Sequence, residues 1–417
     1  MPKFEDILKI LPENTQEFLN PLWDALPEDE KEALKEKFEG LPLDFNLVNM
    51  LMDLAKVQMQ VALGRKNRVA IVGPANVGKS TLYNHFIRQK SDQAEVSPVP
   101  GTTRINQVAD AGIFTVIDTP GADAVGPVGE KEKEEALTAA QEADFLVIMF
   151  DAIQGVKDSE LKLYHQLLAL RKPYLVVLNK IDLVGGKHET DVLEKAASNL
   201  GIETTKLIPI SAKRGVNITK VLMGIVIADP ELLIPMAQAL PQYRWNLSWR
   251  VIVTSSILSG VIALVPLPLI DFIPLITNQS TMVLSIARIH NYKITLKRAR
   301  ELVATFGIGL LARTLFQQIS KLGGVPGWLL SSAIAASTTV AMGYAASIWF
   351  EKGERISQET FNNLSKNLTH FFIESLMNRF KRKPSKKNLK QALEETLDET
   401  GMADRDFIDQ AANTELI

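Results

Sequence analysis

A glycine-rich loop that directly follows a short apolar run constrains this chain most. The run Val69–Val72 leads into the loop Gly73–Thr81, which reads GPANVGKST and fits the pattern G-x-x-x-x-G-K-[ST]. Loop glycines allow backbone N–H groups to turn toward a phosphate, and Lys79 brings a positive charge to its outer oxygens. The Ser80 hydroxyl is a ligand that magnesium accepts. The sequence therefore predicts a strand, a phosphate-binding loop and a helix over Leu82–Ile87 in succession.

Short apolar runs alternate with helical stretches between residues 67 and 230. The runs are Val69–Val72, Phe114–Ile117, Phe145–Phe150, Tyr174–Leu178 and Leu207–Ile210. This order is typical of a mostly parallel sheet with crossover helices. We therefore predict an α/β P-loop domain at 67–230, flanked by all-α regions. These are an acidic helical N-terminal region at 1–66, a hydrophobic helical domain at 231–356 and a charged helical tail at 357–417.

Composition limits the chemistry that the chain can perform. Lys plus Arg is 46 and Asp plus Glu is 48, so the net charge of -2 gives no global field for a nucleic acid backbone, and nucleic acid is not an expected partner. Without cysteine there is no thiolate nucleophile, disulfide or cysteine zinc site. The start MPKFEDILKI carries two acids where a secretory signal needs a basic start and an apolar run. We therefore expect a cytoplasmic protein.

Asp118-Thr119-Pro120-Gly121 follows the second predicted strand and suits a γ-phosphate and its metal ion. Asp118 is suited to hold magnesium through water, and the Gly121 N–H group is suited to donate to the γ-phosphate. Two later motifs point to the base. Asp182, in Asn179-Lys180-Ile181-Asp182, is able to accept two hydrogen bonds from guanine, and adenine cannot donate that pair. Ser211-Ala212-Lys213 closes the last strand, with backbone suited to guanine O6.

Together these motifs predict a GTP-binding protein. The residues expected to contact GTP are Gly73, Asn76, Val77, Gly78, Lys79, Ser80, Thr81, Asp118, Gly121, Asn179, Lys180, Asp182, Ser211, Ala212 and Lys213.

The loop and the segment Pro100-Gly101-Thr102-Thr103-Arg104 resemble the Era- and TrmE-like branch of the translation-factor-related GTPases. The resemblance covers residues 67–230. It implies a GTPase that converts GTP to GDP and phosphate. It also implies that Thr103 binds magnesium beside Ser80 and Asp118 and senses the γ-phosphate. Lys79, Thr103 and Gly121 are then the expected catalytic residues.

Three positions bear on the rate of hydrolysis. Ala122 stands where Ras-type GTPases hold a water-orienting Gln, so we predict slow intrinsic turnover that potassium, face-to-face homodimerisation or a partner stimulates. The resemblance implies a potassium ligand at Asn76, and an Asn that only tightens the loop is the alternative. Glu130 stands where TrmE-type enzymes carry a water-positioning Glu, and a solvated helix start is its alternative reading.

The C-terminal half contains two long uncharged stretches, Val251–Ile270 and Leu322–Phe350. Each is long enough to cross the roughly 30 Å of a bilayer's hydrocarbon, but basic residues between them oppose two full spans under the positive-inside rule. Hairpins that enter and leave on the inner face fit better, so we predict peripheral or hairpin contact with a membrane. The alternative is a soluble helical domain with small-residue packing. Pro266–Pro274 and Leu311–Arg313 resemble a helical domain of unknown function that is fused to Era-like GTPases and often called membrane-associated.

Two functions follow from this sequence. The first is a GTP-hydrolysing switch that controls a hydrophobic helical region at a membrane. The second is a GTP-gated scaffold with negligible turnover and no membrane contact. RNA binding is not expected, because the G-x-x-G match at 324–327 lacks central cations and Lys381–Lys387 is the one basic run.

Overall fold

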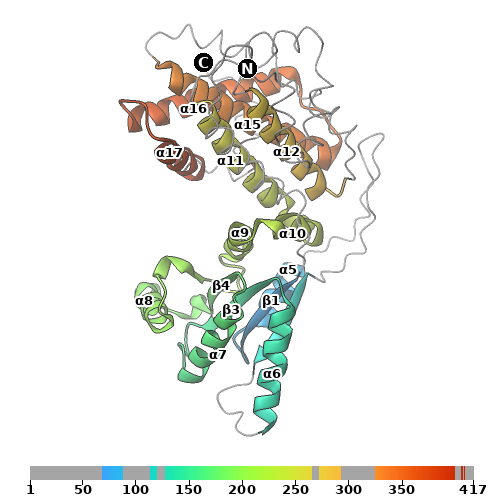
Figure 1. Cartoon of the computed structure of the whole chain (residues 1–417), viewed down its shortest axis with the longest axis vertical. Coiled ribbons are helices and arrows are strands. Elements are labelled where there is room, and N and C mark those ends of the chain that lie inside the picture. Colours follow the sequence, from blue (N-terminus) through green and yellow to red (C-terminus); the bar gives the residue numbers. More distant parts are fainter. Residues whose placement is uncertain are drawn as a thin grey trace, which may run out of the picture. The chain divides into compact units, whose positions relative to one another are not determined.

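The computed structural model describes residues 68–87, 113–119, 127–264, 272–292 and 325–399, with 405, 406 and 408. These residues form two compact units, one running to Arg244 and the other beginning at Trp245 (Figure 1). The predicted N-terminal helical region at 1–66 lies outside the described residues, as do Thr103, Gly121 and Ala122. The domain boundaries expected at 230 and 356 remain predictions.

The first unit is built on a parallel sheet of five strands in the order β2-β1-β3-β4-β5. The strands are β1 (Val69–Pro74), β2 (Phe114–Thr119), β3 (Phe145–Asp151), β4 (Tyr174–Asn179) and β5 (Leu207–Pro209). Each starts at the residue where the apolar pattern predicted a strand, because both faces of this sheet are covered and the strands read as continuous hydrophobic runs. The predicted α/β P-loop fold is confirmed.

Helices connect consecutive strands and cover the sheet (Figure 1). The connecting helices are α5 (Lys79–Ile87), α6 (Pro127–Glu142), α7 (Asp158–Ala169) and α8 (Glu189–Leu200), and α9 (Ile218–Ala228) follows the last strand. Single-turn elements η1 (Ile181–Leu183), η2 (Thr204–Lys206), η3 (Pro230–Leu232) and η4 (Pro241–Tyr243) and the short helix α10 (Leu233–Ala239) complete this unit. One core cluster joins the sheet to α6, α7 and α8 through side chains such as Ala140, Phe150, Tyr164, Leu178 and Leu200.

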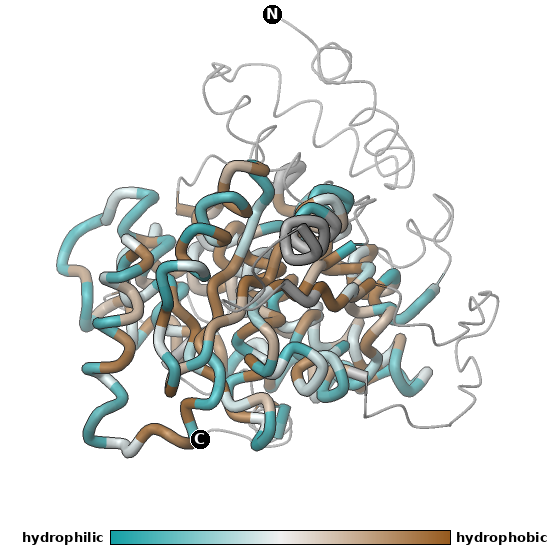
Figure 2. The backbone as a smooth tube through the Cα atoms, turned by 90° about the horizontal axis from the view of Figure 1, so that it is seen from below, coloured by the Kyte–Doolittle hydropathy of each residue, from teal (hydrophilic) through white to brown (hydrophobic). Residues whose placement is uncertain are grey.

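The second unit is helical. Its described helices are α11 (Arg244–Ile262), α12 (Phe272–Ile289), α15 (Gly327–Lys352), α16 (Gln358–Arg379) and α17 (Lys386–Glu399). Helix α15 packs against α12 and α16, and every residue of α15 from Ser332 to Phe350 is buried. Figure 2 shows hydrophobic and hydrophilic stretches that alternate along the described chain.

Buried polar side chains link three of these helices. Asn278 of α12 donates to the carbonyl oxygen of Ser255 at 2.7 Å and to Ser259 Oγ at 2.9 Å, both in α11. Gln279 donates to Thr339 Oγ1 of α15 at 3.0 Å, and Thr339 Oγ1 lies 2.8 Å from Ser259 Oγ. Close packing accompanies these bonds, because a Cβ atom on Gly343 would lie 2.4 Å from Ile252 Cγ1. Thr339, near the middle of α15, is therefore held by polar partners on both α11 and α12.

Within the described ranges, α15 is the one helix long and apolar enough to cross a membrane. The count rises to two if the pair Ile218–Ala228 and Pro230–Ala239, bent by 118°, is taken as one span. Length and composition alone give this result, and 94% of the apolar window of α15 is buried by other parts of the chain. A packed core helix passes the same test, so membrane contact remains a prediction.

Candidate nucleotide-binding site

The carboxyl ends of the central strands bring the predicted motifs to one edge of the sheet. In the strand register Gly73 of β1 pairs with Asp118 of β2, and Asp151 of β3 pairs with Asn179 of β4. Helix α5 begins at Lys79, directly after the glycine-rich loop. In parallel α/β sheets, ligands bind at this edge, where helix N-termini attract phosphate. The fold therefore gathers motifs that lie far apart in the sequence.

The loop after β1 requires its two glycines. A Cβ atom on Gly73 would lie 2.4 Å from the carbonyl oxygen of Met149, and one on Gly78 would lie 2.2 Å from Asn179 Nδ2. Gly78 also has φ of +101°, a conformation that side chains disfavour. Asn76 has φ of 62°, in the left-handed region that asparagine tolerates better than most residues. This backbone supports an Asn that shapes the loop, and the potassium role stays a prediction.

Lys79 is folded into the loop. Its side chain is buried, and Nζ donates to the carbonyl oxygens of Gly73 at 2.7 Å and Pro74 at 2.6 Å. Ser80 and Thr81 follow on the first turn of α5 and are exposed. The loop thus holds one ammonium group at its centre and presents two hydroxyl-bearing residues at its rim.

Asn179 ties the loop to the segment after β5. Its Nδ2 group donates to the carbonyl oxygen of Val77 at 2.7 Å, and its Oδ1 atom accepts from the Ala212 N–H group at 2.9 Å. The side chain is 3% exposed. Sequence reasoning placed Asn179 among the residues that contact GTP. The structure gives its amide two partners within the protein, so it acts on the site by fixing two loops.

Lys180 pairs with an acid that the motif search missed. Its Nζ atom lies 2.6 Å from Asp151 Oδ2, and Asp151 Oδ1 accepts from the Ile153 N–H group at 2.8 Å. Asp151 is 7% exposed, and Lys180 is held at φ of 69°. The sequence did carry a signal for Asp151, because it directly follows the uncharged strand Phe145–Phe150. A carboxylate that is buried at such a position needs a charged or hydrogen-bonding partner.

Asp182 also has a partner that sequence reasoning missed. Its side chain is 7% exposed, and Oδ2 lies 3.5 Å from Nε of Arg214, which is 67% exposed. The Arg214 N–H group donates to Ser211 Oγ at 3.1 Å. Arg214 directly follows the Ser-Ala-Lys motif, and this position beside the base-binding loop is the sequence feature from which its role could have been predicted. Both charged side chains of the 179–182 segment are therefore held by partners from other loops.

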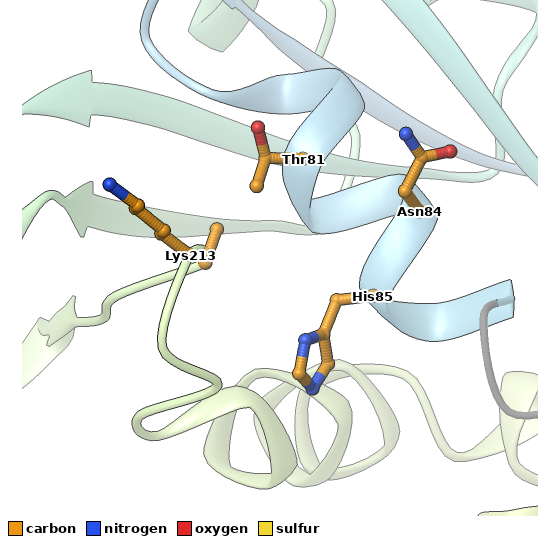
Figure 3. Close-up of a pocket in the computed structure, with 5 residues that line it drawn as sticks. Thr81, Asn84, His85 and Lys213 are labelled. Carbon is orange, nitrogen blue, oxygen red and sulfur yellow. The ribbon is translucent and has the colours of Figure 1, made fainter.

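A pocket of about 220 Å³ lies between α5 and the loop after β5 (Figure 3). Thr81, Asn84 and His85 come from α5, and Ala212 and Lys213 come from the loop. Sequence reasoning named Thr81, Ala212 and Lys213, and it missed Asn84 and His85 because their pattern is that of an ordinary helix. The His85 ring contacts the same loop, because a Cβ atom on Gly215 would lie 2.8 Å from its Cε1 atom.

For the remaining predicted residues the structure gives at most the element to which each belongs and its place in the strand register. Asp118 is the penultimate residue of β2 and pairs in register with Gly73, and Glu130 belongs to α6. Thr103 and Gly121 lie outside the described ranges. Among the residues that the structure describes, no three His, Cys, Asp or Glu side chains gather into a metal site. The magnesium and potassium assignments therefore stay predictions.

Two family models match separate parts of this chain. Residues 68–180 match the family described as 50S ribosome-binding GTPase, and residues 247–374 match a domain of unknown function, DUF697.

The curated relatives are bacterial GTPases. The chain is 32% identical to the tRNA modification GTPase MnmE of Synechocystis sp. over 56% of its own length and 54% of the relative's. It is 33% identical to GTPase Era of Aquifex aeolicus over 39% of its own length and 56% of the relative's. It is 36% identical to GTPase Der of Psychrobacter arcticus over 39% of its own length and 34% of the relative's. The chain thus spans about half the length of these relatives or less.

Among solved structures, Aquifex aeolicus Era bound to GDP and aluminium fluoride is 25% identical, with a TM-score of 0.29 over 46% of this chain and 66% of that one. Era in complex with MgGDPNP and a segment of 16S ribosomal RNA is also 25% identical, with a TM-score of 0.30 over 46% and 67%.

Proposed function

From a chain that carries a GTPase domain of the Era, MnmE and Der type followed by a DUF697 domain, we infer a GTP-hydrolysing molecular switch of the Era-like kind. The observation that carries this function is the Asn179 amide, which joins the phosphate loop at Val77 to the base-side loop at Ala212. One side chain thereby aligns the segment that would hold the phosphates with the segment that would hold the base.

The roles of the site residues follow from their chemistry. Lys79 supplies positive charge to the β- and γ-phosphates, and Asp182 accepts two hydrogen bonds from guanine. The Ala212 N–H group already donates to Asn179, so the N–H group of Lys213 is the backbone donor proposed for guanine O6.

Magnesium is the proposed cofactor. Oxygen donors suit this ion, and the register of β1 with β2 brings Asp118 to the loop that leads to Ser80. Thr103 is the proposed third ligand. The ion neutralises phosphate charge when bound. Lys79 and the Gly121 N–H group then stabilise charge on the γ-phosphate.

GTP turnover by the purified full chain tests this function. The proposal expects phosphate release from GTP in excess over ATP, and Lys79→Ala abolishes that release because the phosphates lose their central cation. Lys220→Ala, which removes an exposed cation from α9, is the matched control and leaves turnover unchanged. GTP binding without phosphate release over many hours would contradict the switch and favour the scaffold.

Slow intrinsic turnover is proposed from Ala122, whose methyl group cannot orient water. Potassium at Asn76, face-to-face homodimerisation, Glu130 or a partner then supplies the missing stimulation. Replacing sodium by potassium while turnover and sedimentation are both recorded separates these routes. If the dimeric protein turns over GTP at the same rate in potassium as in sodium, the potassium route is ruled out.

The helical unit is the proposed effector, and two partners are weighed for it. Contact with the inner face of a membrane is supported by the length and low polarity of α15. A scaffold without membrane contact is supported by the burial of α15 and its hydrogen bonds to α11 and α12. RNA is a third candidate partner, because Era is seen with 16S ribosomal RNA. The net charge of -2 and the missing cations at 324–327 argue against it.

A further inference from the structure

A dense basic segment lies at the corner between α16 and α17. From Ser375 to Leu393 the chain has seven basic residues and no acid, so the rest of the molecule carries a net charge of -9 against +7 here. We call the seven the basic corner: Arg379, Lys381, Arg382, Lys383, Lys386, Lys387 and Lys390. Such separation of charge on an acidic protein creates a local positive field.

Packing turns most of these cations toward solvent. Helix α17 buries Leu389, Leu393 and Leu397, so the face that carries its lysines points outward. Five side chains of the basic corner are exposed and make no ion pair within the described chain: Lys381, Arg382, Lys383, Lys387 and Lys390. Arg379 instead pairs with Glu395. The positive charge is therefore open to an external partner.

The charge order along α17 opposes the stability of the helix. Three lysines occupy its first turns, and four acids, Glu394, Glu395, Asp398 and Glu399, occupy its last turns. A helix dipole favours the opposite order, and like charges four residues apart, as at Lys386 and Lys390, repel. Folding therefore gives no reason for this arrangement. Residues that break a local rule without a structural gain point to a function.

The surroundings of the basic corner favour a lipid surface over RNA. Met377, 46% exposed on the last turns of α16, adds an apolar side chain beside the cations. Single-stranded RNA is read by stacking on exposed aromatic rings, and the one aromatic residue between Ser375 and Leu393, Phe380, is half-buried. Most of the cations are lysines, which act as point charges and lack the planar fork of arginine. A cluster of point charges suits electrostatic contact with many lipid headgroups at once, without a defined binding geometry.

We propose that the basic corner docks the helical unit onto the surface of an anionic phospholipid bilayer. The inference rests on the proposed membrane role and names the residues that perform it. Each cation near an anionic leaflet raises binding by about fivefold, so four together account for more than about a hundredfold. Met377 inserts at the headgroup level and adds a smaller apolar contribution.

Flotation of the full chain on phosphatidylcholine vesicles with and without phosphatidylglycerol tests the proposal. One variant changes Lys381, Arg382, Lys383 and Lys387 to Gln. Its matched control changes Lys187, Lys195, Lys206 and Lys220, four exposed lysines of the GTPase unit, to Gln. Wild type and control float with the anionic vesicles, and the corner variant loses at least about a hundredfold in partitioning. Added salt weakens the binding of wild type.

Three results overturn the inference. The first is equal flotation of the corner variant and wild type, and the second is equal flotation of wild type on both kinds of vesicle. The third is binding of a single-stranded RNA oligonucleotide that the corner variant loses, without flotation of wild type. GTP turnover on the same samples separates the two proposals. Turnover without corner-dependent flotation overturns only the docking surface, and flotation without turnover overturns only the GTPase.

Discussion

Gly78 occupies a backbone position that other residues cannot adopt without strain. Its φ is +101°, and a Cβ atom would meet the Asn179 amide at 2.2 Å. That amide holds two hydrogen bonds and cannot swing away without breaking them. We expect Gly78→Ala to weaken GDP binding by more than about tenfold, through left-handed strain of roughly 1–2 kcal/mol plus the clash. Calorimetric titration measures this. Gly186→Ala, with open space around it, is the control that binds normally.

Asp151 acts on the site through Lys180. Loss of its carboxylate leaves the Lys180 ammonium without the 2.6 Å partner that holds it beside the base site. A hydrogen bond to a charged group contributes about 1.5–3 kcal/mol, so Asp151→Asn should weaken GTP and GDP alike by about tenfold or more. Nucleotide titration measures both affinities, and Asp158→Asn at the exposed start of α7 serves as the control. Unchanged affinity in Asp151→Asn would remove the positioning role.

Among the elements, helix α15 depends on a glycine at its closest contact. A Cβ atom on Gly343 would lie 2.4 Å from Ile252 Cγ1 in α11, and both helices are fixed by buried hydrogen bonds. Gly343→Ala should therefore destabilise the helical unit by about 1–3 kcal/mol through overpacking. Thermal unfolding measures the loss. Gly327→Ala at the start of the same helix meets nothing and should leave Tm unchanged or slightly raised.

Helix α7 carries an acid in its first turn that responds to pH. Burial raises the pKa of Glu160 above its ordinary value of 4.5, although the Lys157 N–H group donates to it. The charged form is therefore penalised in the folded state, and stability rises as pH falls from neutrality through the folded-state pKa. Glu160→Gln keeps an acceptor and should raise Tm at pH 7 relative to wild type. That gain should vanish near pH 4, whereas Glu194→Gln on an exposed face of α8 should show no such trend.

The whole molecule divides into two compact units with separate cores. We expect two thermal transitions in the full chain, and only the transition of the GTPase unit should respond to nucleotide. A ligand at a hundred times its Kd adds about 2.7 kcal/mol to the unit that binds it. Calorimetry with GDP measures the shift. Gly78→Ala should reduce this shift by at least about half, because a tenfold weaker Kd leaves about 1.4 kcal/mol at the same GDP concentration. Gly343→Ala should lower only the other transition. A single transition that moves as one would contradict independent units.

The sequence by itself determined the parallel sheet, the phosphate loop and the order of the nucleotide motifs. These features are local, because buried strands read as apolar runs and a phosphate loop needs its glycines at fixed spacing. The tertiary structure alone decided the partners of Asn179, Lys180 and Asp182, because each comes from a loop far away in the chain. It also decided the surroundings of α15. A spanning helix and a core helix share one composition, and only the hydrogen bonds of Ser259 and Gln279 to Thr339 show that this buried hydroxyl has partners inside the protein.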